Sequence, residues 1–195
     1  GLTDNLFLKN WMVLSPVKID KTVAKPDENK QKEAFEKDLL TSVAVQPKKN
    51  LTNVKLGDMV YSWKPAKFED GIIDFNKLFN NLDFSFAYAL AEIKMDNPEK
   101  ILVGIGSDDA IKIFLNGKLV HSNLIARSLR PDEDMIILDL KKGSNQILVK
   151  VQDIEMDWAF CIRKLGKNTL NNNLIEAAGS GNLENVKLLI ANGAD

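Results

Sequence analysis

Short hydrophobic runs separated by turn residues dominate the chain from Phe7 to Leu165. Several of these runs recur at a spacing of about ten residues and are typical of an antiparallel, all-β sandwich. Because successive runs can pair as sequential neighbours, the pattern predicts a meander or jelly roll. The predicted core consists of Val103, Ile105, Ile111, Ile113, Leu115, Ile136, Leu138, Ile147, Val149, Val151 and Phe160.

The first half of the chain holds several predicted strands and one predicted helix. Residues 6–17 and 54–67 each have the pattern of a strand, and residues 71–81 predict a strand or a strand that runs into a short turn of helix. Residues 84–95 are rich in alanine, but their aromatic residues alternate, and this favours a strand over a helix. Residues 28–40 instead place apolar residues at helical spacing among charges, and Asp27 is the predicted N-cap. One helix is therefore expected among the strands.

The pattern changes near residue 166 and becomes helical from Thr169 to Asp195. Leu174 and the alanines that follow predict one helix, which the segment 179–182 (Gly-Ser-Gly-Asn) interrupts. Residues 183–193 predict a second helix that Gly193 ends. The sequence therefore predicts a β-sandwich over residues 1–166 and a short helix-turn-helix over residues 169–195.

The stretch VGIGSDDAIKIFLNGKLVH, from Val103 to His121, combines a tight turn with a pair of acids. Asn116-Gly117 predicts a type I′ hairpin turn, because both residues tolerate a positive φ. Asp108 and Asp109 have two interpretations. Their carboxylates can accept backbone N–H groups in a turn, or they can bind a ligand or a calcium ion. In an extended strand adjacent side chains point to opposite faces, so binding requires a bend, a bulge or a cis peptide.

Composition excludes several classes of protein. The formal net charge of −1 provides no overall field to attract nucleic acid or an anionic membrane. No apolar run approaches the roughly 18 residues that a membrane span requires. The single histidine, His121, excludes a histidine-rich metal site, and the single cysteine, Cys161, is predicted to be a buried core residue. A catalytic triad would depend on that one histidine, so we expect no intrinsic enzymatic activity.

Three further side chains are candidates for a binding surface. Trp63, which precedes a Lys-Pro pair, fits either the core or an exposed rim where it could stack on a sugar. Arg127 and Arg130 lie in the polar segment 127–135, for which a solvated loop and a binding rim are both open interpretations. Trp11 and Trp158 lie within apolar runs and are predicted to be core residues.

The C-terminal segment resembles an ankyrin repeat. The resemblance rests on Leu174, Ala177-Ala178, Gly181, Asn182-Leu183-Glu184, Val186-Lys187-Leu188-Leu189 and Gly193-Ala194-Asp195. The family's Thr-Pro-Leu-His opening is replaced by Asn-Asn-Leu-Ile at residues 172–175. The resemblance implies protein binding and, because one repeat cannot bury its apolar face alone, a chain cut at the start of a longer array. The helix pair is then expected to lean on the sandwich or on another molecule.

The first part resembles the galactose-binding-like jelly rolls of bacterial secreted proteins. The stretches that carry the resemblance are WMVLSPV, YALAEIKM, GSDDAIKIFLNGKLVH, LDLKKGSNQILVKVQD and WAFCIRKL. The related protective-antigen-type sandwiches use an adjacent Asp-Asp pair to hold a calcium ion that grips sugar hydroxyls. The resemblance therefore implies that Asp108 and Asp109 are metal ligands. It also favours a secreted or periplasmic location. The Asn and loop carbonyls of that family's site have no assignable counterpart in the sequence.

These observations favour a non-catalytic binding or scaffold protein. The sandwich would recognise a carbohydrate or an envelope component through Asp108, Asp109, Trp63, Arg127 and Arg130, and the ankyrin-like segment would bind a protein. One alternative is an accessory module of a larger secreted enzyme that processes glycans or peptides. Another is a structural spacer.

Overall fold

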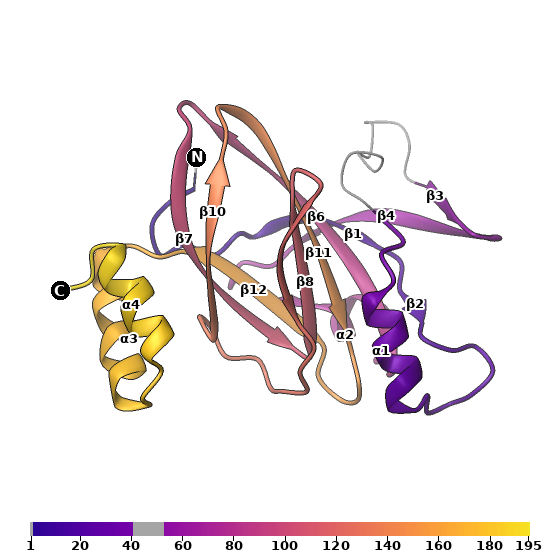
Figure 1. Cartoon of the computed structure of the whole chain (residues 1–195). Helices are drawn as coiled ribbons and strands as arrows, with labels where there is room; N and C mark the ends of the chain where they lie inside the picture. The colour runs from indigo at the N-terminus through magenta and orange to yellow at the C-terminus, as the bar shows by residue number, and fades with distance from the viewer. Residues whose placement is uncertain (1, 41–52) are drawn as a thin grey trace.

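The computed structural model describes residues 2–40 and 53–195, which form two facing antiparallel sheets with helices on the outside (Figure 1). The larger sheet has the order β3 (Asn53–Leu56), β4 (Met59–Lys67), β1 (Asn10–Leu14), β6 (Ser85–Met95), β11 (Gly143–Gln152), β8 (Ala110–Leu115) and β9 (Lys118–Asn123), with β2 (Val17–Lys18) beside β6. The smaller sheet has the order β10 (Asp134–Leu140), β7 (Glu99–Asp108), β12 (Ala159–Lys164) and β5 (Ile73–Asp74). The mainly β, antiparallel fold predicted from the sequence is confirmed.

The main hydrophobic core lies between the two sheets. It combines inward-facing residues of the larger sheet, such as Val149, with those of the smaller sheet, such as Ile105, and it includes Trp11 and Trp158. All eleven predicted core residues belong to it, although Ile136 is only partly buried. Cys161 is fully buried, as predicted, and burial raises the pKa of its thiol to about 12.

Two predicted strands differ in detail from the observed ones. Residues 54–67 form the hairpin β3–β4 rather than one strand, because the turn between them contains Gly57 with a φ of 62°. Residues 6–17 contain β1 and the start of β2, separated at Ser15-Pro16. The Asn116-Gly117 turn has the two positive φ values expected of a type I′ hairpin, and it joins β8 to β9 as predicted.

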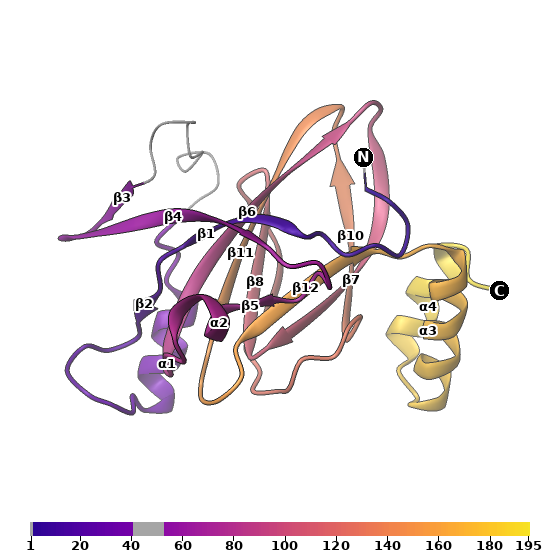
Figure 2. The ribbon, with the colours of Figure 1, turned by 180° about the vertical axis from the view of Figure 1, so that it is seen from behind.

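The outer face of the larger sheet is covered by α1 (Glu28–Glu36), as Figure 2 shows from behind. Asp27 is its N-cap, as predicted, and its side chain accepts a hydrogen bond from the Lys30 N–H at 2.8 Å. Two lysines of the sheet bind the C-terminal carbonyls of this helix. Lys150 of β11 donates to the carbonyl oxygens of Ala34, Phe35 and Lys37. Lys112 of β8 donates to Glu36 and to the Asp38 carboxylate.

The predicted helix pair is also confirmed, as α3 (Lys167–Gly179) and α4 (Leu183–Ala191). It leans on the outer face of the smaller sheet, where Leu170, Ala177 and Leu189 pack with Leu102, and Met135 and Ile137 pack against this cluster. The N-terminal segment also contacts the start of α3. The side-chain oxygen of Asn5 accepts hydrogen bonds from the Gly166 N–H and the Thr169 hydroxyl. A short helix, α2 (Phe75–Phe79), follows β5. No described helix is long and apolar enough to cross a membrane.

Candidate functional site

The acid pair lies where β7 meets β8, and its two carboxylates converge. The Asp108–Asp109 peptide bond is cis. The two carboxyl groups hydrogen-bond to each other, although each residue is only 6% exposed. Ligand binding by this pair requires both carboxyl groups to point to one place, and they do.

Backbone N–H groups from two neighbouring loops hold the pair. The Asp109 carboxylate accepts from the Arg127 N–H and from the Ile154 N–H, both at 2.9 Å. For Asp109, the interpretation as an acceptor of backbone N–H groups is thus confirmed. Each carboxylate oxygen has two lone pairs, so these bonds leave acceptor capacity for a ligand.

A third acid, Asp153, lies next to the pair at the end of β11. Its residue is fully buried, and neither carboxylate oxygen has a hydrogen-bond partner among the described residues. Burial, together with the charges of Asp109 and Asp83, raises the pKa of Asp153 to about 8. An unpaired buried carboxylate costs free energy, so this position is one where a bound cation or a donor group would be stabilising.

The pKa values of Asp108 and Asp109 are also raised. Burial is the largest cause for Asp108, followed by the charges of Asp109 and Asp157, and its pKa rises to about 7. Burial also raises the pKa of Asp109, although its backbone donors oppose this. Three carboxyl groups with raised pKa values therefore share one end of the sandwich, which is an arrangement common at binding and catalytic sites.

An ion-pair network beneath the loop of residues 124–133 fixes the position of Arg127. Its guanidinium donates to the carbonyl oxygen and the hydroxyl of Ser107 and to both oxygens of Asp134. His121 Nε2 lies 2.9 Å from Asp134 Oδ2. Burial opposes ionisation of Asp134, but the hydrogen bonds from His121 and Arg127 outweigh it and hold the pKa below its usual range. Arg127 thus positions the acid pair through its backbone, and its guanidinium is committed to this network rather than to a ligand.

Two glycines of β7 allow that loop to lie directly on the sheet. A Cβ at Gly106 would be 2.4 Å from the Arg130 carbonyl oxygen, and a Cβ at Gly104 would be 2.0 Å from the Asp132 carboxylate. Asp132 also pairs with Arg163 of β12 and accepts from Asn173 of α3. Gly104 and Gly106 therefore allow the loop of residues 124–133 to approach the acid pair. The sequence analysis did not predict this role.

A pocket of about 280 Å³ opens beside the pair. It is lined by Ile72, Asp74, Asp108, Ser128, Leu129, Asp157, Trp158 and Ala159. Asp74 is engaged as the N-cap of α2, where its side chain accepts from the Lys77 N–H. The polar groups of the pocket are therefore carboxylates and one hydroxyl. Among the described residues no basic side chain lines it, so it is suited to hydroxyl donors or cations.

Two predicted binding residues lie away from this pocket. Trp63 is 2% exposed and lies in a second core with Leu14, Tyr88 and Leu148. The interpretation of Trp63 as a stacking residue on a rim is therefore wrong, because its ring is covered. Arg130 is exposed but lines a different cleft, with Asn173 and Glu176 of α3. Asp153 was not predicted, because an acid at a strand end carries no periodicity signal.

No group of three or more His, Cys, Asp or Glu side chains within residues 2–40 and 53–195 is arranged to hold a metal ion. The donor chemistry nevertheless fits a hard cation, since every candidate ligand at the acid pair is an oxygen. A calcium ion would thus need backbone carbonyls or ligand hydroxyls in addition to the carboxylates.

Comparison with known proteins finds no matching family model and no matching curated protein. Solved structures are similar to this chain at low identity. A PA14 sugar-binding domain from an RTX adhesin shares 9% identity with a TM-score of 0.41, covering 80% of this chain and 91% of that one. A family 35 carbohydrate-binding module from Clostridium thermocellum shares 13% with a TM-score of 0.31, covering 40% and 68%. A β-glucosidase from Kluyveromyces marxianus shares 11% with a TM-score of 0.39, covering 59% of this chain and only 16% of the enzyme.

Proposed function

We propose that the β-sandwich is a non-catalytic carbohydrate-binding module and that its ligand binds in the pocket beside Asp108. The observation that carries this proposal is the convergence of Asp108 and Asp109 at the end of β7, where Asp108 lines the pocket. Carboxylates are strong acceptors for hydroxyl donors, and a sugar presents several hydroxyls on one face. The pocket is also of the small, partly polar kind that fixes the orientation of such a ligand.

A calcium ion fits the same donor chemistry, and Asp108 and Asp109 would hold it. When bound, it would supply a positive charge that neutralises the two carboxylates and accepts sugar hydroxyls as further ligands. Calcium takes six to eight oxygens, more than these side chains provide. We therefore expect calcium and sugar each to bind more tightly in the presence of the other, because each completes the other's coordination.

Hydrolysis by the acid pair is disfavoured on distance. Retaining glycosidases separate their two carboxyl groups by about 5 Å and inverting ones by more. Asp108 and Asp109 instead hydrogen-bond directly to each other, which leaves no room for a scissile bond between them. The alternative, an accessory module attached to a glycan- or peptide-processing enzyme, is compatible with the same binding role and differs only in what the module is attached to.

Calorimetry with calcium and a panel of neutral sugars tests the proposal. We expect sugar binding that EDTA weakens at least tenfold and that Asp108→Asn or Asp109→Asn abolishes. Asp139→Asn provides the matched control, since Asp139 is an exposed acid on β10, outside the pocket. Absence of sugar binding with calcium present would overturn the proposal. Sugar binding that is indifferent to EDTA would overturn its calcium part alone.

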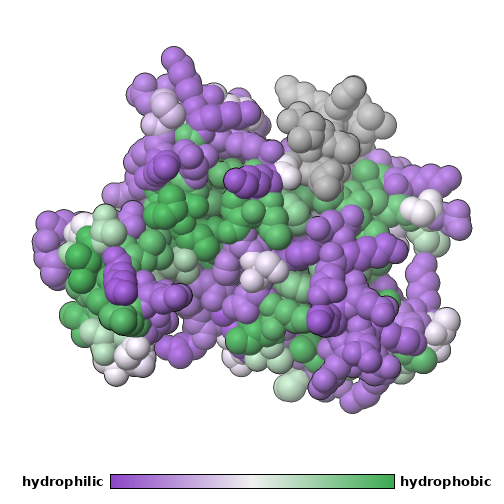
Figure 3. Space-filling view, in the orientation of Figure 1, coloured by the Kyte–Doolittle hydropathy of each residue, from purple (hydrophilic) through white to green (hydrophobic). Residues whose placement is uncertain are grey.

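We propose a second role, protein binding, for the helix pair. Its support is a set of exposed apolar side chains on α3 and α4, namely Ile175, Leu183 and Ile190, and Figure 3 shows hydrophobic residues gathered over this part of the surface. The ankyrin resemblance implies the same role. A Leu183→Glu, Ile190→Glu variant that captures the same proteins from an extract as the wild type would contradict it.

A further inference from the structure

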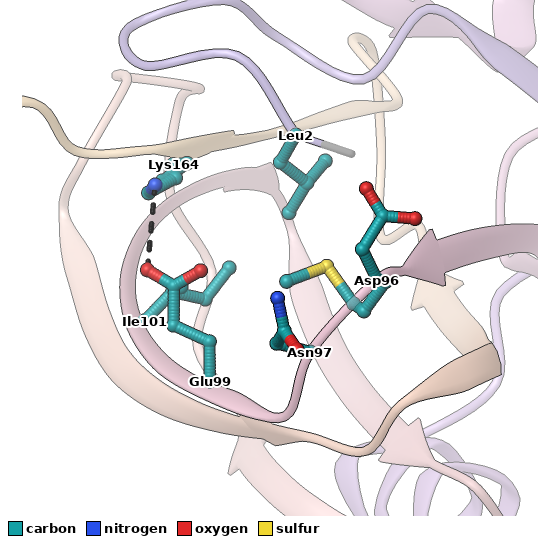
Figure 4. Close-up of a pocket in the computed structure, with 7 residues that line it drawn as sticks. Leu2, Asp96, Asn97, Glu99, Ile101 and Lys164 are labelled. Atoms are coloured by element: carbon teal, nitrogen blue, oxygen red, sulfur yellow. Dashed lines mark ion pairs between the residues drawn. The ribbon is translucent and has the colours of Figure 1, made fainter.

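A second pocket, of about 230 Å³, lies at the opposite end of the sandwich from the acid pair (Figure 4). Its wall includes Glu99, the first residue of β7, whereas Asp108 is the last residue of that strand. A ten-residue strand spans roughly 30 Å, so the two pockets cannot share one small ligand. A function for this second pocket has to be argued from its own residues.

The floor of this pocket is apolar and its rim is acidic. Leu2, Met95 and Ile101 supply the apolar surface. Asp96 and Asn97, from the turn between β6 and β7, and Glu99 supply polar groups, and Figure 4 shows Asp96 and Glu99 on different sides of the apolar floor. An elongated ligand can therefore place an apolar stem on the floor and a polar head at the rim.

The charges of the rim define the head group. Lys164, the only basic residue in the lining, is already paired with Asp4 at 2.9 Å and lies 3.7 Å from Glu99. Its bond to Asp4 raises the pKa of Lys164, so it remains an ammonium. Asp96 has no ion-pair or hydrogen-bond partner within the described part of the chain. The rim thus keeps unpaired negative charge for a cationic group.

We infer that this pocket takes the side chain of a lysine or arginine presented by a protein partner. Such side chains lay a methylene stem on apolar surface while their charged head stays at the water boundary, and this matches Met95 and Ile101 below an Asp96 rim. The inference does not depend on the proposed sugar site. Together the two pockets would let the sandwich contact a sugar at one end and a basic protein segment at the other.

Nuclear magnetic resonance titration of the full chain with capped single amino acids tests the inference. Nα-acetyl-lysine amide is the probe, and Nα-acetyl-norleucine amide has the same stem without the ammonium. We expect the lysine probe to perturb the amides of residues 95–101 and to bind about two- to fivefold more tightly than norleucine, the range typical of an exposed ion pair. Asp96→Asn should remove that advantage, and Asp139→Asn should keep it.

Three outcomes would overturn the inference. The first is the absence of perturbation at residues 95–101 at millimolar probe. The second is equal affinity for the lysine and norleucine probes, which would reduce the pocket to apolar contact. The third is an unchanged lysine preference in Asp96→Asn. Because sugar binding is measured separately at the Asp108 end, a failure here leaves the proposed function untouched, and a failure there leaves this pocket untouched.

Discussion

Lys150 and Asp153 are both fully buried and lie three residues apart, yet their surroundings are opposite. The Lys150 amino group donates to three carbonyl oxygens at the end of α1, with Lys37 at 2.8 Å and Phe35 at 3.2 Å, and lies 4.4 Å from the centre of the Phe86 ring. Burial lowers the pKa of this amino group to about 7. Asp153 has no donor for either oxygen in the described residues. Burial alone therefore does not separate a structural charge from a binding one, whereas the number of partners does.

The largest expected effect is the loss of the Lys150 contacts. Lys150→Met keeps the stem but leaves the carbonyls of α1 without their donor, and each unsatisfied buried group costs about 1–3 kcal/mol. We expect a fall of about 3 kcal/mol in the free energy of unfolding, measured by urea denaturation. Lys142→Met, at an exposed position, should be neutral. If Lys150→Met is as stable as the wild type, the Lys150 contacts do not stabilise the fold, and the contrast with Asp153 is lost.

The second expected effect is a pH dependence of the free energy of unfolding, caused by Asp108 and Asp153. The pKa values of Asp108, about 7, and Asp153, about 8, lie above the ordinary value of 3.8. Between pH 5 and 7 the folded protein keeps protons that the unfolded chain has lost. The free energy of unfolding, measured by urea denaturation in EDTA, should therefore fall as pH rises, by about 1.4 kcal/mol per pH unit for each carboxyl group that stays protonated.

Two additions sharpen this measurement. Asp153→Asn should make the fall with pH shallower, because one of the proton-holding groups is gone. Calcium should also reduce it, because a bound cation favours the ionised carboxylates. Stability that is flat or rises between pH 5 and 7 would mean that Asp153 has partners in solution, and its contrast with Lys150 would disappear.

A third and smaller effect concerns the loop that supplies the N–H donors to Asp109. Gly106→Ala places a methyl against the Arg130 carbonyl oxygen, and overpacking of this kind costs about 1–3 kcal/mol. We expect a loss of about 2 kcal/mol in thermal denaturation, together with weaker ligand binding beside Asp108. Gly179→Ala, where no atom lies within 4 Å of the new Cβ, should be neutral or slightly stabilising. Unchanged stability in Gly106→Ala would show that the loop moves away easily.

The smallest effect is expected at Lys112, the less buried of the two lysines that bind α1. Lys112→Met removes its bonds to the Glu36 carbonyl and to the half-exposed Asp38 carboxylate. Water can replace part of these contacts, so we expect about 1 kcal/mol by urea denaturation. If Lys112→Met costs as much as Lys150→Met, the loss in stability depends on the bonds to the α1 carbonyls and not on how completely the lysine is buried.

The sequence predicted the strands, the N-cap at Asp27 and the helix pair, because these depend on local periodicity and turn chemistry. It also pointed to Asp108 and Asp109 as a candidate pair, because adjacent acids at a strand end fit either turn chemistry or a ligand site. It could not identify Asp153 or the Gly104 and Gly106 contacts, which depend on which loop lies across β7. Trp63 was ambiguous for a similar reason, because the residues that bury it, such as Leu14 and Tyr88, depend on the tertiary fold.

The contact of Asn5 with Gly166 and Thr169 joins positions 161 and 164 residues apart. For anyone dividing this chain into smaller pieces, the junction at residue 166 is therefore a poor place to cut. A piece lacking the first five residues would lose the side chain that caps α3. A piece ending at residue 166 would leave Leu102 and Ile137 open to water. If fragments made by such cuts are insoluble, the cause would be the lost contact between the helix pair and the smaller sheet. Their insolubility would say nothing about whether either half can bind its ligand.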